Sequence, residues 1–157
     1  MSVTKAFRPT PDLAPDLLDR LRGRLAASPV LARLGASLEE LALDRAVLKL
    51  PYRDDISNGS GTVHGGILAT LADTAVAFAL STNFDGKMGF ATSDLTIHFL
   101  RRARGDVWAR AEIIKKGRRV NVGEVAITDA QGVEVARVLA GFLLTTSSFD
   151  YAPERNP

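Results

Sequence analysis

Residues 58–80 read NGSGTVHGGILATLADTAVAFAL, a glycine-rich loop followed by an apolar stretch that contains a single carboxylate, Asp73. From Gly65 to Ser81 the chain has no proline and is rich in alanine and leucine, which favour helices. The sequence therefore predicts a central helix that begins directly after His64.

Four stretches after this helix alternate between apolar and polar side chains, as half-buried strands do. They cover residues 91–100, 106–117, 119–129 and 133–146 and are separated by turns that contain glycine. We expect each turn to reverse the chain, so that neighbouring strands pair in an antiparallel sheet.

The N-terminal part combines helical and strand patterns. Leucines recur at helical spacing from Leu13 to Leu25, and Pro29 starts a second helical piece that ends near Gly35. Two short strands are then expected at residues 41–43 and 47–52, joined by a turn near Asp44 and Arg45. The chain is thus expected to be an α+β protein, with about six antiparallel strands around one long helix.

Length and composition favour a single domain. The 157 residues are 46% hydrophobic and 24% charged, which is enough to bury a sizeable core. We expect an N-terminal arm and helical segment over residues 1–35, the main domain over 36–147 and a C-terminal tail over 148–157.

The numbers of cysteine and histidine residues limit the kinds of reactive and metal-binding sites that the chain can form. The chain has no cysteine and only two histidines, so disulfides, thiolate ligands and a cysteine nucleophile are excluded, and no metal site is predicted. No stretch has the apolar core of a signal peptide or the length of a transmembrane helix. We therefore expect a cytoplasmic protein without membrane contact.

The glycine-rich loop does not match the common phosphate or nucleophile motifs. A P-loop requires Lys and then Ser or Thr after its last glycine, but Gly66 is followed by Ile67 and Leu68. The dinucleotide-binding motif requires glycine where His64 stands, and the hydrolase pattern Gly-x-Ser-x-Gly is absent from the sequence. A catalytic serine in the usual setting is therefore not predicted.

The start of the helix has two interpretations. The backbone N–H groups of Gly65 and Gly66 would be unpaired at the positive end of the helix dipole, where they can bind a developing oxyanion. Alternatively, the glycines only allow a sharp turn into a crowded helix. Asp73 is likewise either part of a solvent-facing polar stripe or a catalytic carboxylate.

Helix geometry separates the two candidate groups. Gly65 and Asp73 are eight residues apart in sequence, which corresponds to about 12 Å along a helix axis. One helix cannot bring both groups to the same carbonyl carbon. Two antiparallel helices related by a two-fold axis can, so chemistry at this helix implies a dimer.

A basic segment directly follows the predicted strand at residues 91–100. Residues 101–120 contain eight basic and two acidic residues, a net charge of +6 in a chain of formal net charge +2. Such a segment suits a ligand that carries phosphates, although lysine and arginine also protect strand edges. Trp108 is its only aromatic residue, which argues against base stacking and hence against nucleic-acid binding.

Together, Asn58, GTVHGG (61–66), ADTA (72–75) and ATSDLTIHFLRRA (91–103) resemble the hot-dog fold acyl-CoA thioesterases of the phenylacetate-degradation (PaaI-like) type. The resemblance extends over roughly residues 35–146. It implies an antiparallel sheet wrapped around the central helix, a homodimer with two active sites at the interface, and often a dimer of dimers. No cofactor is implied, because coenzyme A is part of the substrate.

The resemblance also implies roles for five residues. Gly65 would donate its N–H to the thioester carbonyl, and His64 would shape that turn. Asn58 would position the loop or the attacking water. Asp73 would be the catalytic carboxylate, supplied by the opposite subunit, and Thr92 would help to hold the water near it.

The chemistry of thioesters is compatible with so small a site. A thiol has a pKa near ~8.5, so a thiolate leaves with little acid assistance, and one carboxylate with one oxyanion donor suffices. Asp73 can act as general base or attack directly to form a mixed anhydride; we favour the general base.

Coenzyme A phosphates would account for part of the basic segment. Relatives commonly contact the nucleotide end at a turn that corresponds to Lys116, Gly117 and Arg118, and Arg101, Arg102 and Arg104 are further candidates. Gly66 belongs to the same predicted substrate-binding set. The family usually has proline at the Arg102 position, so the shape of that turn departs from the family pattern.

Two other functions remain open from the sequence. A hot-dog protein can bind an acyl-CoA without cleaving it, as a sensor or partner subunit, although about 35 residues before the core leave little room for a DNA-binding domain. A hot-dog hydratase or dehydratase requires an Asp and His arrangement on its helix, and no histidine follows Asp73 in this helix.

Overall fold

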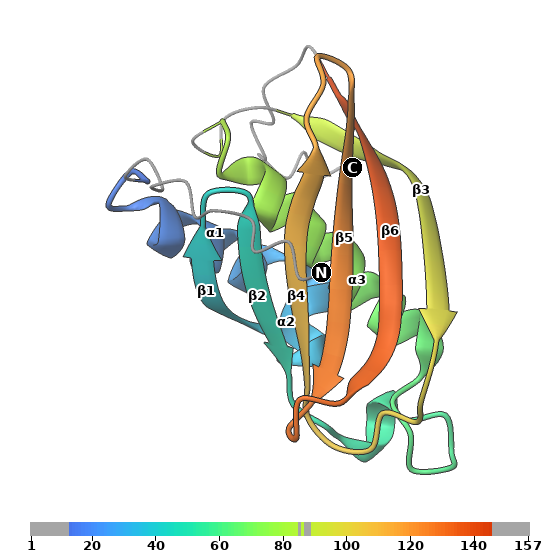
Figure 1. The fold of residues 1–157 in the computed structure, drawn as a ribbon. Coiled ribbons are helices and arrows are strands. Elements are labelled where there is room, and N and C mark those ends of the chain that lie inside the picture. Colours follow the sequence, from blue (N-terminus) through green and yellow to red (C-terminus); the bar gives the residue numbers. More distant parts are fainter. Residues whose placement is uncertain (1–12, 85, 87–88, 146–157) are drawn as a thin grey trace, which may run out of the picture.

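A computed structural model describes residues 13–84, 86 and 89–145, and six strands within them form one antiparallel sheet. The strand order is β1-β2-β4-β5-β6-β3, and helix α3 lies behind the sheet in Figure 1. The elements are α1 (Leu17–Ala27), α2 (Pro29–Leu34), β1 (Ser37–Ala42), β2 (Arg45–Leu50), the 3-10 helix η1 (Asp54–Ile56), α3 (Gly65–Ser81), β3 (Phe90–Phe99), β4 (Val107–Lys115), β5 (Val120–Asp129) and β6 (Glu134–Leu144). The predicted α+β class, with about six antiparallel strands around one long helix, is confirmed.

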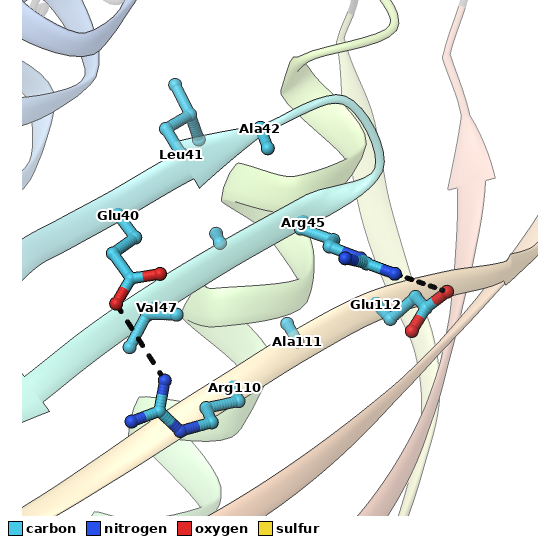
Figure 2. A pocket seen from close by; sticks show the side chains of 9 residues that line it. Glu40, Leu41, Ala42, Arg45, Val47, Arg110, Ala111 and Glu112 are labelled. Atoms are coloured by element: carbon cyan, nitrogen blue, oxygen red, sulfur yellow. Dashed lines mark ion pairs between the residues drawn. The ribbon is translucent and has the colours of Figure 1, made fainter. Parts of the chain in front are cut away.

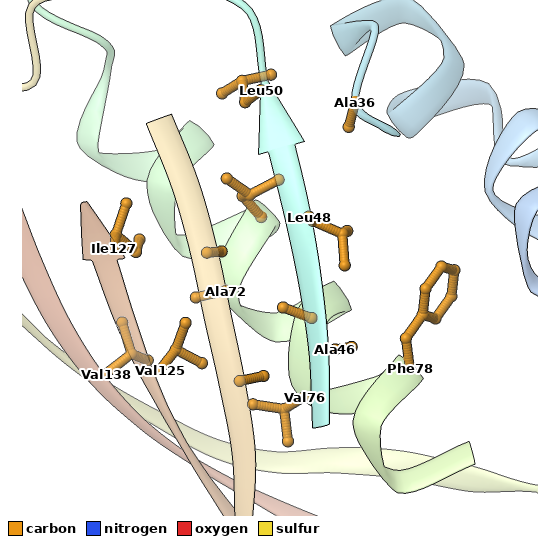
Figure 3. Packing of buried hydrophobic residues seen from close by; sticks show 14 of the residues in the cluster. Ala36, Ala46, Leu48, Leu50, Ala72, Val76, Phe78, Val125, Ile127 and Val138 are labelled. Carbon is orange, nitrogen blue, oxygen red and sulfur yellow. The ribbon is translucent and has the colours of Figure 1, made fainter. Parts of the chain in front are cut away.

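The core lies between α3 and the sheet face turned toward it. Every second residue of β2, β4 and β5 is buried there, among them Leu48, Ala109 and Val125. These side chains form one buried cluster with Ala72 and Val76 of α3, and Figure 3 labels Leu48, Val125 and the two helix residues within it. The helix approaches β5 closely at Gly123, where an added Cβ would lie 2.5 Å from Cγ1 of Val76. The absence of a side chain at Gly123 thus fixes how deeply α3 sits on the sheet.

The N-terminal helices cover the flank of α3 beside β1. Leu17, Leu21 and Leu25 are buried along one side of α1, as their helical spacing predicted. Gly35 ends α2 with φ 69°, a left-handed conformation that favours glycine. Figure 3 shows Phe78 of α3 pointing toward this N-terminal part of the chain. Phe78 is buried in the core.

The first two strands differ from their predicted bounds. β1 begins at Ser37, four residues earlier than expected. The prediction missed this start because a register shift between Leu38 and Glu40 interrupts the alternation by which a strand is recognised. β2 ends at Leu50, directly before Pro51. The predicted turn is correct, and Asp44 adopts φ 64° within it.

β3 forms one edge of the sheet. Within the described residues it pairs only with β6, from Phe90 opposite Leu144 to Phe99 opposite Ala136. Figure 1 shows β3 running beside α3 at this edge, with its other side free of strands. The predicted arm before residue 13 and the tail after residue 147 lie outside the described residues.

Candidate active site

His64 holds the first turn of α3. It is the N-cap residue, and its Nδ1 accepts a hydrogen bond from the N–H of Gly66 at 3.0 Å. Its backbone carbonyl accepts from Ile67 and Leu68. The N–H of Gly65 has no acceptor within the described ranges. The turn therefore leaves one donor, Gly65, available to a ligand at the positive end of the helix.

The predicted pair of free N–H groups is thus reduced to one. Gly66 is exposed, but its N–H is already engaged by the His64 ring. His64 caps this turn through the hydrogen bond from Gly66, and its role in a substrate site stays a prediction. Contact of Gly66 with substrate stays a prediction.

Phe99 lies against the backbone of Gly65. A Cβ added to Gly65 would be 2.8 Å from Cζ and 3.1 Å from Cε1 of the Phe99 ring. This contact was not predicted from the sequence. The sequence feature that could have indicated it is the alternation of β3, which puts Phe99 on the same face as Leu95 and Ile97.

Asp73 and Thr92 form a polar pair between α3 and β3. The Thr92 hydroxyl donates to Oδ1 of Asp73 at 2.8 Å. Asp73 is half-buried, and burial raises the pKa of its carboxyl, while the smaller effect of the Thr92 hydrogen bond lowers that pKa. Among the described residues, none donates to the second carboxylate oxygen, Oδ2. The carboxylate is therefore fixed in orientation and keeps one oxygen for a water molecule.

The N–H of Gly65 and the carboxylate of Asp73 do not meet within one chain. Gly65 is the first residue of α3 and Asp73 lies two turns further along the same straight element. Their separation is about 12 Å along the axis, as the sequence predicted. A site that uses both groups on one carbonyl requires a second copy of the chain.

Asn58 organises the loop that precedes α3. Its Oδ1 accepts from the N–H and the hydroxyl of Ser60, at 3.1 Å and 2.7 Å, and its own N–H donates to Thr62. Ser57 and Val63 form an isolated bridge across the same loop. Asn58 is exposed and its predicted contact with the attacking water is not tested by this arrangement.

Side-chain hydrogen bonds at Lys116 and Gly117 hold the turn between β4 and β5. Nζ of Lys116 contacts Oδ2 of Asp44 at 2.8 Å and Oδ1 of Asn83 at 3.0 Å, which ties this turn to the β1–β2 turn and to the end of α3. The N–H of Gly117 donates to Oδ1 of Asn121, a side chain only 2% exposed. Arg118 is exposed.

The contacts of Lys116 were not expected from the sequence, because Asp44 and Asn83 lie 72 and 33 residues away from it along the chain. A Cβ on Gly117 would be 2.7 Å from the carbonyl oxygen of Val120, so the turn requires glycine. Contact of Lys116, Gly117 and Arg118 with coenzyme A stays a prediction.

Arg101 and Arg102 lie at the opposite end of the sheet. They follow Phe99, the last residue of β3, whereas the β4–β5 turn adjoins the end of the sheet where Phe90 begins β3. Ten strand residues separate these ends by about 30 Å. Nη1 of Arg101 donates to the carbonyl of Glu134. One chain therefore cannot place all the predicted phosphate ligands around one phosphate.

A surface hollow occurs elsewhere, on the sheet face turned away from α3 (Figure 2). It lies over β1, β2 and β4, and two ion pairs cross it, Glu40–Arg110 at 3.9 Å and Arg45–Glu112 at 3.7 Å. None of the predicted site residues lines it. The chemistry of α3 is therefore not located in this hollow.

The described residues contain no group of three or more His, Cys, Asp or Glu side chains arranged to bind a metal ion. None of the helices found in this part of the chain has the length and apolar character needed to cross a membrane.

Comparisons with known proteins agree with this geometry. The sequence profile of the thioesterase superfamily matches residues 60–136. A putative esterase from Halobacterium salinarum is 37% identical over 118 residues, which cover 68% of this chain and 78% of the relative. Acyl-coenzyme A thioesterase PaaI from Escherichia coli is 31% identical over 105 residues, which cover 66% of this chain and 73% of that enzyme.

A solved structure shows the same fold. The Escherichia coli PaaI protein from the phenylacetic acid degradation operon matches with a TM-score of 0.79 over 87% of this chain and 99% of that chain, at 23% identity. At this identity the structural likeness supports the fold alone.

Proposed function

This chain belongs to the thioesterase superfamily and is a PaaI-like hot-dog protein, and from that premise we propose that it hydrolyses the thioester bond of an acyl-CoA to a free acid and coenzyme A. The observation that carries the proposal is the half-buried Asp73 carboxylate, held by Thr92, on a helix whose first N–H is free. A carboxylate and an oxyanion donor are the two groups that thioester hydrolysis requires.

Asp73 is proposed to act as general base. With Oδ1 held by Thr92, Oδ2 can accept a proton from a water molecule as that water attacks the carbonyl carbon. The tetrahedral intermediate would place its oxyanion at the Gly65 N–H, and the coenzyme A thiolate would then leave. The raised pKa of Asp73 makes its carboxylate a stronger base than an exposed aspartate.

The site is proposed to lie between two copies of the chain. The free edge of β3 offers backbone groups for pairing with β3 of a second copy. If two such strands pair in antiparallel fashion about their middle, the Phe99 end of one lies beside the Thr92 end of the other. Gly65, which contacts Phe99, would then approach Asp73 of the opposite copy. A further association into a dimer of dimers remains part of the proposal.

The same pairing would assemble the proposed phosphate site. It brings Arg101 and Arg102 of one copy toward the end of the sheet that carries Lys116, Gly117 and Arg118 of the other. Arginine and lysine bind phosphates by charge-assisted hydrogen bonds. The nucleotide end of coenzyme A is the ligand that this combined set would suit, and no separate cofactor is proposed.

Thiol release from a panel of short, medium, long and aromatic acyl-CoAs tests the proposed function. We expect turnover with at least one class, and a fall of about 10²–10⁴-fold in kcat for Asp73→Asn. Asp94→Asn is the matched control, because Asp94 is an exposed carboxylate further along the same strand as Thr92. Binding of acyl-CoA without thiol release would show an acyl-CoA-binding protein instead.

A further inference from the structure

Phe99 combines an apolar ring, high exposure and contact with the proposed oxyanion donor. It lies on the face of β3 turned toward α3, yet the residue is 56% exposed. The end of its ring touches the backbone of Gly65, where an added Cβ would be only 2.8 Å from Cζ. A large apolar side chain therefore stands beside the one free N–H of the helix start.

The position of the ring limits what can surround a bound carbonyl. An oxygen bound to the Gly65 N–H lies about 2.9 Å from that nitrogen, and the carbonyl carbon about one bond length further. Groups attached to that carbon then lie near Gly65, where the Phe99 ring comes within 2.8 Å of an added Cβ, and they can approach the ring no closer than van der Waals distance, about 4 Å. Additional bulk on the nearest carbon would meet the ring.

Polarity decides which substituent lies next to the ring. Toward the middle of β3, the same face continues from Phe99 through Ile97 and Leu95, both half-buried and apolar. On the other side of Phe99 the chain continues into Arg101 and Arg102. The acyl group suits the apolar side, and the charged coenzyme A arm suits the arginines.

We infer that Phe99 is a specificity-determining residue, whose ring restricts bulk at the acyl carbon next to the thioester carbonyl. Acyl groups without a branch at this carbon are then preferred over groups that carry one. The inference rests on the proposed thioesterase function, because it concerns the substrate of that same site. A single additional methyl group in such a contact changes kcat/KM by about 10–200-fold.

The test compares two esters that differ by one methyl group. The first is the best unbranched acyl-CoA of the panel, and the second is the same ester with a methyl group on the carbon next to the carbonyl. For the wild-type protein we expect kcat/KM to be at least about tenfold higher with the unbranched ester. Phe99→Ala should reduce this ratio by about tenfold or more, and Phe99→Leu should give an intermediate ratio.

Leu139→Ala is the control, because Leu139 is 46% exposed and lies on the opposite face of the sheet, in β6. It should leave the ratio unchanged. A wild-type protein that turns over both esters equally well would overturn the inference. So would a ratio that stays constant in both Phe99 variants, or loss of all turnover in both. Absence of turnover by the wild-type protein with every ester would instead contradict the proposed function.

A double-variant cycle tests the contact itself. Gly65→Ala keeps the N–H but directs a methyl group into the Phe99 ring. The loss of kcat caused by Gly65→Ala should therefore be smaller in the Phe99→Ala background than in the wild type. An equal loss in both backgrounds would mean that the ring does not restrict this position.

Discussion

The ring of His64 fixes the direction of the first N–H groups of α3 through one nitrogen. Nδ1 must carry no hydrogen in order to accept the hydrogen bond from Gly66, so the hydrogen of the neutral ring sits on Nε2. This role as an N-cap does not require an imidazole. Asparagine is among the best N-cap residues and can accept the same bond, whereas alanine cannot.

His64→Ala should therefore lower the free energy of unfolding by about 0.5–2 kcal/mol, and it should reduce kcat because the Gly65 N–H loses its orientation. His64→Asn should recover most of the stability. Urea unfolding and thiol release measure the two effects. Full recovery of stability without any recovery of kcat would show that His64 does more than position the turn.

The hydroxyl of Thr92 lowers the pKa of Asp73, against the larger effect of burial. Burial raises the pKa of Asp73 and the Thr92 hydrogen bond opposes that effect. A general base acts only when ionised, so activity falls as the pH drops through this pKa. Thr92→Val removes the opposing effect and should move the acidic limb of the kcat profile to higher pH.

The pH profile of kcat for thiol release measures this shift, and Ser93→Ala is the matched control. Ser93 is adjacent in the strand, but its hydroxyl donates to Asp94 and not to Asp73. An acidic limb that stays in place in Thr92→Val would separate the Thr92 hydroxyl from the ionisation of Asp73.

At the scale of elements, the helix was the most predictable part and the strand ends the least. The sequence places α3 at residues 65–81, because glycines precede it and no proline interrupts it. The start of β1 was missed, since a register shift after Leu38 hides the alternation. Strand alternation predicts which face a side chain occupies, but the partner strand that lies opposite depends on the complete sheet.

Two glycines should respond in opposite ways to alanine. Gly123→Ala forces a methyl group against Val76 at the contact between β5 and α3, and should cost about 1–3 kcal/mol of stability. Gly23→Ala, within α1, meets nothing within 4 Å and should stabilise by about 0.5–1 kcal/mol.

Denaturant unfolding of both variants gives these free energies. The cost of Gly123→Ala should shrink when Val76→Ala removes the opposing methyl groups. An unchanged cost in that background would mean that Gly123 is required for another reason, such as backbone freedom.

At the scale of the whole molecule, residue spacing in the sequence predicts some features, whereas contacts between distant turns are not predicted. The eight-residue spacing of Gly65 and Asp73 predicts a dimer if both groups act on one carbonyl, whereas the pairing of Asp73 with Thr92 was expected from the family resemblance. The tether of Lys116 to Asp44 and Asn83 joins three turns that are distant in sequence. Such contacts depend on the completed sheet and are not encoded in any local pattern.

Two variants can remove the two halves of the proposed site separately. Asp73→Asn removes the base. Gly65→Pro removes the N–H donor; proline is favoured at the first position of a helix, and His64 already has the extended conformation required before proline. Because an added Cβ at Gly65 would lie 2.8 Å from Cζ of Phe99, Phe99→Ala is introduced into both copies to make room for the proline ring. Each variant alone should be nearly inactive, with Gly65→Pro losing about 10²–10³-fold in kcat.

Mixed dimers of these two variants test whether each site is shared. In a dimer with one copy of each, one site combines the intact Gly65 of the first copy with the intact Asp73 of the second, while the other site lacks both groups. Mixed dimers purified through two different tags should therefore regain roughly half of the turnover per dimer of the protein that carries Phe99→Ala alone. A site contained within one chain would regain none, because neither copy holds both groups. Stable mixed dimers without recovered turnover would thus contradict the shared site while leaving the dimer itself intact.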